Sequence, residues 1–233
     1  MSTLGNFMNT SVIRSASQIN QAMGRVYGYM MMAVLVSMFT SFQVGTNHDL
    51  VQFFFTGAMH WVVLFAPLVF IFLVPILINS GIGKAGKILT LAAFAALMGL
   101  SFAVIFAVYT MSSIFTAFMG AGVLFGTMSF FGYFTKKDLS ELGSLLFVGL
   151  IAIIIASIIN IFIGSTVMQM VISAIAIIIF LGLTAYDTQQ IREMVTYDAD
   201  DGVEVMGALT LYLDFINLFL NLLQLFGVSK SDD

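Results

Sequence analysis

A long apolar stretch near the C-terminus, Ala208–Phe226, carries an aspartate well inside it. The stretch is long and apolar enough to cross a bilayer, which takes about 20 residues. A charged side chain near the middle of such a span costs at least about 2.5 kcal/mol, so it usually faces protein or water rather than lipid. Asp214 therefore predicts that this span is central and that the rest of the chain surrounds it.

Other polar side chains follow the same line along this span. They recur at intervals of three or four residues, which places them on one narrow face of a helix: Thr210, Asp214, Asn217, Asn221 and Gln224. A membrane helix with one polar stripe turns that stripe to other helices or to a water-filled path. We therefore expect these side chains to line such a path, with Asn217, Asn221 and Gln224 on its outer side.

The composition fixes the class of protein. Of the 233 residues, 60% are hydrophobic and only 9% are charged, which is typical of a polytopic membrane protein. Apolar runs predict an all-α protein with seven membrane helices, over residues 26–44, 58–79, 88–109, 112–134, 142–163, 167–190 and 205–227. The expected organisation is an N-terminal tail over 1–22, one membrane domain over 23–228 and a short tail over 229–233.

Small residues recur in the fourth predicted helix. Gly120, Gly122, Gly126, Ser129 and Gly132 stand at spacings that allow close approach of a neighbouring helix. The pattern indicates tight helix packing there.

Basic residues predict the orientation in the membrane. The N-terminal tail and the second, fourth and sixth loops hold nearly all of them, namely Arg14, Arg25, Lys84, Lys87, Lys136, Lys137 and Arg192. The other side holds only Lys230. By the positive-inside rule, the N-terminus is expected to be cytoplasmic and the C-terminus outside.

The chain offers little to catalysis. It has no cysteine, its two histidines stand apart, and no lysine or arginine lies within a predicted span. No nucleophile–base pair or zinc site is apparent, so we expect neither an enzyme nor a resident cofactor or metal. The small net charge of -4 gives no indication of a nucleic-acid partner.

A second carboxylate lies near the basic end of the sixth predicted helix. If this helix packs against the next, Asp187 and Asp214 approach each other in the cytoplasmic half of the membrane. Two close carboxylates in a poorly solvated place resist joint ionisation, so the pair can hold a proton or a cation. The alternatives are that Asp187 reaches interfacial water and that Asp214 is a structural hydrogen-bonding partner.

Three segments resemble the Bax inhibitor-1 family, especially its bacterial members: TKKDLS, LTAYDTQQI and GALTLYLDFINLFLNLLQLFG. The resemblance implies two three-helix layers around a central C-terminal helix, in a bacterial inner membrane. It also implies a pH-sensitive calcium leak with Asp187 and Asp214 as the sensor. Some bacterial members pair one aspartate with an arginine at the end of the second helix. Here that end reads Ile78–Asn79–Ser80–Gly81, and the nearest base is Lys84.

Two classes of function follow. The first is a passive channel for calcium or another cation, whose partners are the lipid bilayer, calcium ions and protons. The alternative, also suggested by the family, is a regulator that binds a membrane-anchored AAA protease through its N-terminal tail. A proton-coupled exchanger using the same aspartates is a third hypothesis and differs from the leak in requiring a counter-gradient.

Overall fold

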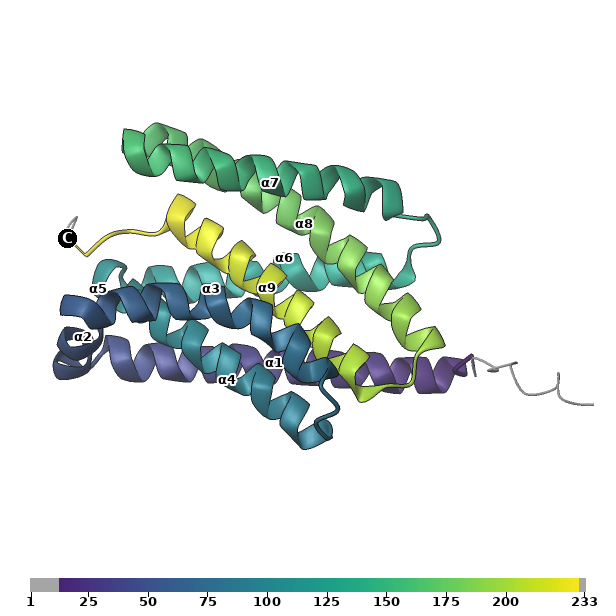
Figure 1. Cartoon of the computed structure of the whole chain (residues 1–233). Coiled ribbons are helices and arrows are strands. Elements are labelled where there is room, and N and C mark those ends of the chain that lie inside the picture. The colour runs from purple at the N-terminus through teal and green to yellow at the C-terminus, as the bar shows by residue number, and fades with distance from the viewer. Residues whose placement is uncertain (1–12, 231–233) are drawn as a thin grey trace, which may run out of the picture.

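The computed structural model describes residues 13–230, which form helices and no β-strand (Figure 1). The helices in this part of the chain are α1 (Ala16–Gly45), α2 (His48–Phe55), α3 (Gly57–Asn79), α4 (Lys84–Phe102), α5 (Ile105–Val108), α6 (Met111–Phe134), α7 (Ser140–Ile163), α8 (Thr166–Tyr197) and α9 (Asp201–Phe226).

Seven helical segments of the described chain are long and apolar enough to cross a membrane, which confirms the predicted all-α membrane class. They are α1, α3, α4 continued by α5, and α6 to α9. The prolines of α3, Pro67 and Pro75, do not interrupt that helix.

Two helical features differ from the expectation. The first helix begins at Ala16 rather than residue 26, because Ser15 and Gln18 form a capping box that starts it within the predicted tail. The short helix α2 was not expected at all. It begins where the Asn47 side chain accepts hydrogen bonds from the amides of Asp49 and Leu50.

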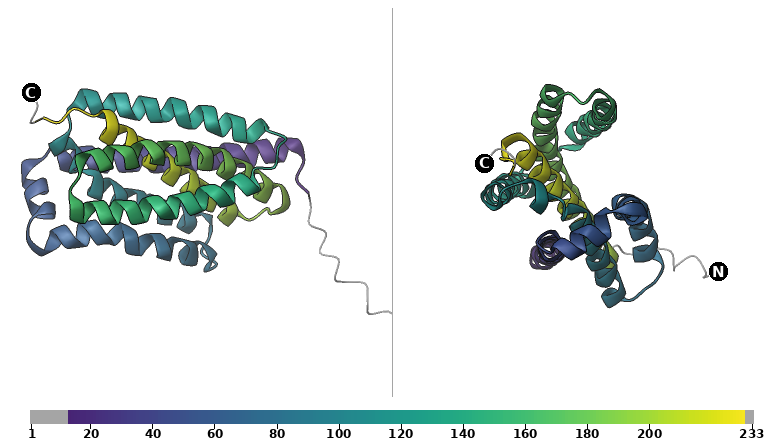
Figure 2. Two further views of the ribbon diagram at one scale, coloured as in Figure 1. Left: turned by 90° about the horizontal axis from the view of Figure 1, so that it is seen from above. Right: turned by 90° about the vertical axis from the view of Figure 1, so that its left-hand side faces the viewer.

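The helix α9 lies between two groups of helices (Figures 1 and 2). On one side it packs against α1, α4 and α3, and on the other against α6 and α8. The helix α7 packs mainly against α8. Since α9 is the most buried of the candidate spans, its side chains meet other helices on nearly every face.

Fewer of the small residues of α6 take part in close helix contact than the sequence pattern predicts. A β-carbon at Gly132 would collide with the carbonyl oxygen of Ala185 in α8, so glycine is needed there. Gly122 and Gly126 face open space, and Gly120 is in ordinary contact distance of Leu222. The tight α6–α8 contact therefore depends on the end of the pattern and not on its whole length.

Ion pairs fix the start of α9. Glu204, whose side chain is only 1% exposed, accepts hydrogen bonds from the Arg25 guanidinium at 2.7 Å (Nε) and 2.5 Å (Nη2). Arg14 lies 3.5 Å from the same carboxylate. Lys84 pairs with Asp201, and Lys87 with Asp200, where the ammonium lowers the pKa of the Asp200 carboxyl. These contacts connect α9 to residues of α1 and α4 and to the segment before α1.

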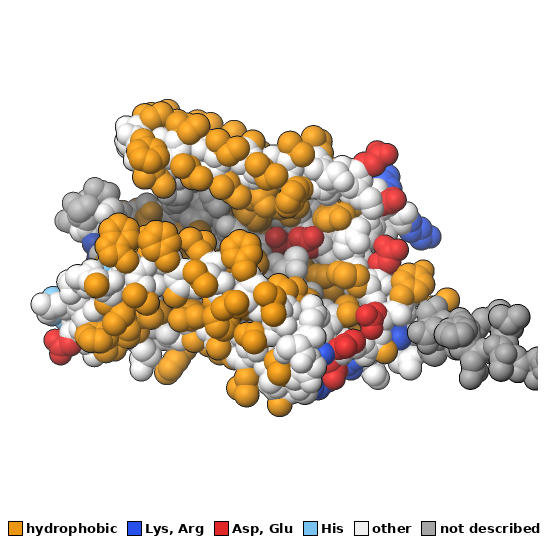
Figure 3. All heavy atoms as spheres, viewed as in Figure 1, with side chains coloured by type: hydrophobic (Ala, Val, Ile, Leu, Met, Phe, Trp, Pro, Cys, Tyr) orange, Lys and Arg blue, Asp and Glu red, His pale blue; other side chains and the backbone are white. Residues whose placement is uncertain are grey.

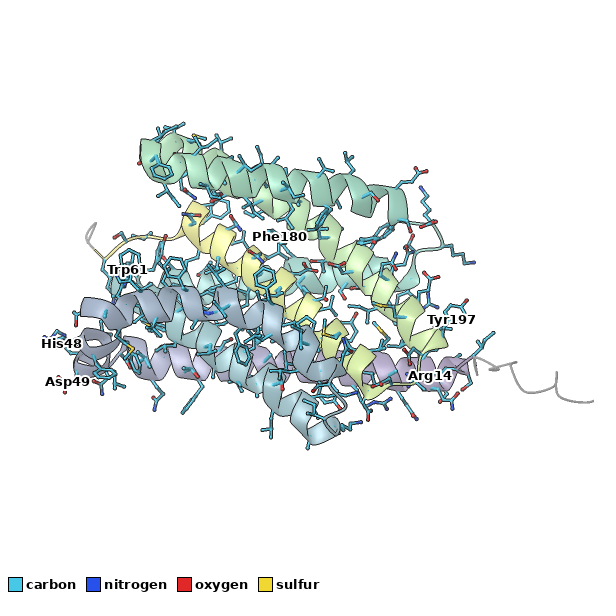
Figure 4. All side chains as sticks on the ribbon, in the orientation of Figure 1. Arg14, His48, Asp49, Trp61, Phe180 and Tyr197 are labelled. Carbon is cyan, nitrogen blue, oxygen red and sulfur yellow. The ribbon has the colours of Figure 1, made fainter. Side chains whose placement is uncertain are left out.

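The two ends of the bundle differ. Figure 4 shows Arg14 and Tyr197 at one end and His48, Asp49 and Trp61 at the other. At the second end the C-terminal segment crosses the α5–α6 junction, where the Lys230 amide donates to Val108 O at 2.9 Å. The Lys230 ammonium donates to Phe106 O at 2.7 Å, so this base is engaged with backbone.

Candidate functional site

A cleft of about 970 Å³ runs along α9, bounded by α3, α7 and α8. Figure 3 shows acidic side chains at the bottom of a hollow between two apolar surfaces. The side chains lining the cleft include every residue that the sequence predicted for the site: Asp187, Thr210, Asp214, Asn217, Asn221 and Gln224. The structure therefore places the whole polar stripe of α9 on one cleft.

The two aspartates meet in this cleft. Asp187 comes from α8 and Asp214 from the antiparallel α9, and their carboxyl groups lie within hydrogen-bonding reach of each other. Asp214 is 4% exposed, and its Oδ2 atom is buried without a hydrogen-bond partner among the described residues. Asp187 thus lies beside Asp214 and also borders the cleft, and Asp214 Oδ2 is available to bind a donor or a cation.

The polar side chains of the stripe other than Asp214 and Gln224 bond to the backbone of their own helix. The Nδ2 group of Asn217 donates to Leu213 O at 2.8 Å, and that of Asn221 donates to Asn217 O at 2.8 Å. The Thr210 hydroxyl donates to Met206 O at 3.2 Å. A backbone carbonyl only accepts, so each of the two asparagine bonds uses one N–H of the amide and leaves its Oδ1 and its second N–H available. The middle of the cleft therefore combines two carboxylates with two amides that can still accept and donate hydrogen bonds.

The far end of the cleft is held by side-chain bonds that sequence reasoning missed. The Ser173 hydroxyl donates to Gln224 Oε1 at 2.8 Å, connecting α8 to α9. Asn160 donates to Gln169 Oε1 at 3.0 Å, connecting α7 to α8. Asn160, Gln169 and Ser173 are polar residues inside apolar runs, and the sequence could have indicated them for that reason. Phe180 of α8, labelled in Figure 4, also lines the cleft.

A group of three hydroxyls next to Asp187 was also not predicted from the sequence. The Tyr27 and Ser129 hydroxyls are 2.6 Å apart, and Ser129 and Thr188 are 2.9 Å apart. These three hydroxyls, of which those of Ser129 and Thr188 belong to buried residues, join α1, α6 and α8 next to Asp187. It holds the α8 backbone in place at that depth.

No lysine or arginine lines the cleft in the described part of the chain. Lys84, the base nearest to the end of α3, is paired with Asp201 instead. Among residues 13–230, no base at the end of α3 lines the cleft that holds the aspartates.

Comparisons with known proteins agree with the fold and the motifs. A family model described as "Inhibitor of apoptosis-promoting Bax1" matches residues 19–231. The chain is 35% identical over 224 residues to the inner membrane protein YbhL of Escherichia coli (strain K12), covering 93% of this chain and 95% of that protein. It is 36% identical over 235 residues to an uncharacterized membrane protein of Streptococcus pyogenes serotype M3, covering 94% and 99% respectively. With seven candidate membrane helices and a match over most of its length, the chain belongs to the Bax inhibitor-1 family.

Proposed function

We propose that this protein is a passive cation leak, with calcium as the ion that the family suggests, and that Asp187 and Asp214 are its pH sensor. The observation that carries the proposal is the meeting of these carboxylates in a cleft lined by the polar stripe of α9. Two carboxylates so close resist joint ionisation, so their combined charge depends on pH.

The chemistry of the cleft favours cations over anions. Its central polar groups are two carboxylates and two amides, and no lysine or arginine of the described chain lines it. Calcium takes six to eight oxygen ligands, roughly, and two carboxylates supply only part of that set. An ion here keeps water or moves between groups, which suits passage better than tight storage.

The proposal includes a location and an orientation. The relative from Escherichia coli is named as an inner membrane protein, and we assign the same membrane to this chain. The bases at one end of the bundle, including Lys84, Lys87 and Arg25, favour a cytoplasmic position for that end. The N-terminus is then cytoplasmic and the C-terminus outside.

Calcium flux into proteoliposomes, followed between roughly pH 5 and pH 8, tests the proposal. We expect a wild-type flux that changes with pH. Asp214→Asn and Asp187→Asn should each remove or strongly weaken the pH response, because each variant takes away one of the two carboxylates whose combined charge is the proposed sensor.

Asp138→Asn is the matched control, since it removes a carboxylate from the exposed α6–α7 loop and keeps an acceptor for the Ser140 amide. This variant should behave as wild type. Folded protein without flux above empty liposomes at any pH would exclude the leak. A flux that appears only under an imposed pH gradient would favour the exchanger instead.

The alternative, regulation of a membrane-anchored AAA protease, depends on the N-terminal tail. Residues 1–12 of that tail lie outside the described residues. The part that follows is engaged with the bundle, since the Arg14 amide donates to Thr196 O at 3.1 Å and its side chain faces Glu204. A test of this alternative should therefore delete residues 1–12 and keep the Ser15 cap. Loss of a protease-dependent effect with flux intact would support it.

A further inference from the structure

The cleft along α9 has an opening at its side, between α3 and α7. The helices α3 and α7 stand on opposite sides of it and are not packed together (Figure 3). Their rims are apolar and exposed, with Leu68 on α3 and Phe147, Ile154 and Ile158 on α7. Apolar helix surfaces at this depth face lipid chains in a bilayer. The side opening therefore gives the carboxylates a route to the hydrocarbon region.

The polar groups inside the cleft favour a positively charged head group over a negatively charged one. Asp214 Oδ2 is buried without a partner among the described residues, Asp187 lies beside it, and no lysine or arginine of the described chain lines the cleft. An alkylammonium group has three donors and no acceptor, which complements such a surface. A sulfate or phosphate head would meet carboxylates of like charge with no lysine or arginine of the described chain to compensate, and should be rejected.

We propose that the cleft binds a lipophilic ammonium ion, a single-chain amphiphile with a primary amine head, which enters from the bilayer between α3 and α7. The head lies at Asp187 and Asp214, and the chain lies against Leu68 and Ile154. A volume of about 970 Å³ accommodates a molecule of this size. The site shares its carboxylates with the proposed leak, but binding does not require that any ion pass through the protein.

A second crevice in the same molecule has no charged lining residue and serves as the reference for labelling that depends on the alkyl chain alone. It has a volume of about 430 Å³, lies mainly between α1 and α6, and is lined by apolar side chains such as Phe39 and Phe115 together with two serines, Ser37 and Ser41. None of its lining residues carries a charge. Any alkyl chain can enter this crevice, whereas the cleft along α9 should prefer the amine.

Photo-crosslinking with three dodecyl probes tests the proposal. Each probe carries a diazirine in mid-chain, and the heads are an amine, an alcohol and a sulfate. The purified full chain is labelled in calcium-free phosphatidylcholine–detergent micelles, and labelled peptides are mapped by mass spectrometry. The readout is the ratio of labelling on α7 and α9 at the cleft to labelling at Phe39 and Phe115.

We expect this ratio to be about tenfold higher for the amine than for the alcohol, as loss of one charge-assisted hydrogen bond predicts. Asp214→Asn and Asp187→Asn should reduce it to the alcohol's value, and Asp138→Asn should leave it unchanged. Ile154→Trp, which fills the cleft and keeps both carboxylates, should also lower it. This second kind of variant keeps the test valid if an aspartate variant fails to fold.

Equal ratios for the three heads would overturn the proposal, as would an amine ratio that survives both aspartate substitutions. A competition experiment with added phosphatidylethanolamine tests whether a two-chain phospholipid occupies the cleft instead. If this lipid abolishes amine labelling, the occupant is a two-chain phospholipid, and the single-chain proposal is wrong. Because the experiment measures no flux, a failed leak assay does not affect its outcome.

Discussion

At the scale of residues, the buried carboxylates of this protein fall into two kinds. Glu204 is 1% exposed and fully paired, with Arg25 at hydrogen-bonding distance and Arg14 close by. Asp214 is 4% exposed, faces another carboxylate, and has an oxygen without a partner in the described chain. The first arrangement stabilises the fold, whereas the second leaves a group available for binding.

Arg25→Met should destabilise the protein by about 3 kcal/mol. Breaking a buried ion pair leaves one charge without compensation, and the value lies at the low end of the usual range because Arg25 is partly exposed. Arg14 remains near Glu204 and limits the loss further. Thermal or denaturant unfolding in detergent measures the effect.

Lys84→Met is the matched control, because it removes an ion pair at the same end that is exposed on both sides. Its cost should be below about 1 kcal/mol. Equal losses for the two variants would contradict the structural role given to the Arg25–Glu204 pair. The double variant Arg25→Met with Glu204→Leu should recover part of the stability.

At the scale of elements, α9 has two different faces. One face carries the polar stripe and borders the cleft, while the other buries large side chains such as Tyr212 and Phe215 against α1, α4 and α6. The tight α6–α8 contact supports this arrangement from outside, because it fixes α8 and therefore Asp187. Gly132 and Ala185 form its closest point.

Gly132→Ala should cost about 1–3 kcal/mol, the usual penalty for overpacking. The added methyl would meet the Ala185 backbone, which cannot move aside without shifting α8. Gly122→Ala, in the same helix and facing open space, should be neutral or slightly stabilising. Comparison of the two melting temperatures in one detergent checks the prediction. A Gly132→Ala protein as stable as wild type would mean that the helices are less closely packed than described.

At the scale of the whole molecule, seven candidate spans place the two ends of the described chain on opposite sides of the bundle. The described bases gather at one end, apart from Lys230, which is hydrogen-bonded to the backbone at the other. This distribution underlies the proposed orientation.

The absence of cysteine allows a direct test of that orientation. His48→Cys and Lys136→Cys place single thiols at exposed positions at opposite ends of the bundle. A membrane-impermeant maleimide should label His48→Cys in spheroplasts, whose inner membrane is intact. It should label Lys136→Cys only in inverted membrane vesicles. The reverse pattern would contradict the proposed orientation, and labelling of both thiols from one side would contradict the membrane fold.

The amino-acid sequence by itself determined the class of protein, the seven spans and the polar stripe of α9. It could do so because a bilayer imposes a strong local rule: each span must be about 20 apolar residues long, so a charge inside one stands out. Asp214 and its neighbours at helical spacing were therefore recognisable without any knowledge of contacts. The early start of α1 was also readable in the Ser15–Gln18 capping box, although its polar composition concealed it.

Only the tertiary structure decided which of these residues meet. Arg25 and Glu204 are 179 residues apart, and hydropathy says nothing of how two distant helices are rotated toward each other. The contact of Asp187 with Asp214 depends on such rotations. The side opening between α3 and α7 depends on helices that do not touch, and a local pattern cannot encode the absence of a contact between distant segments.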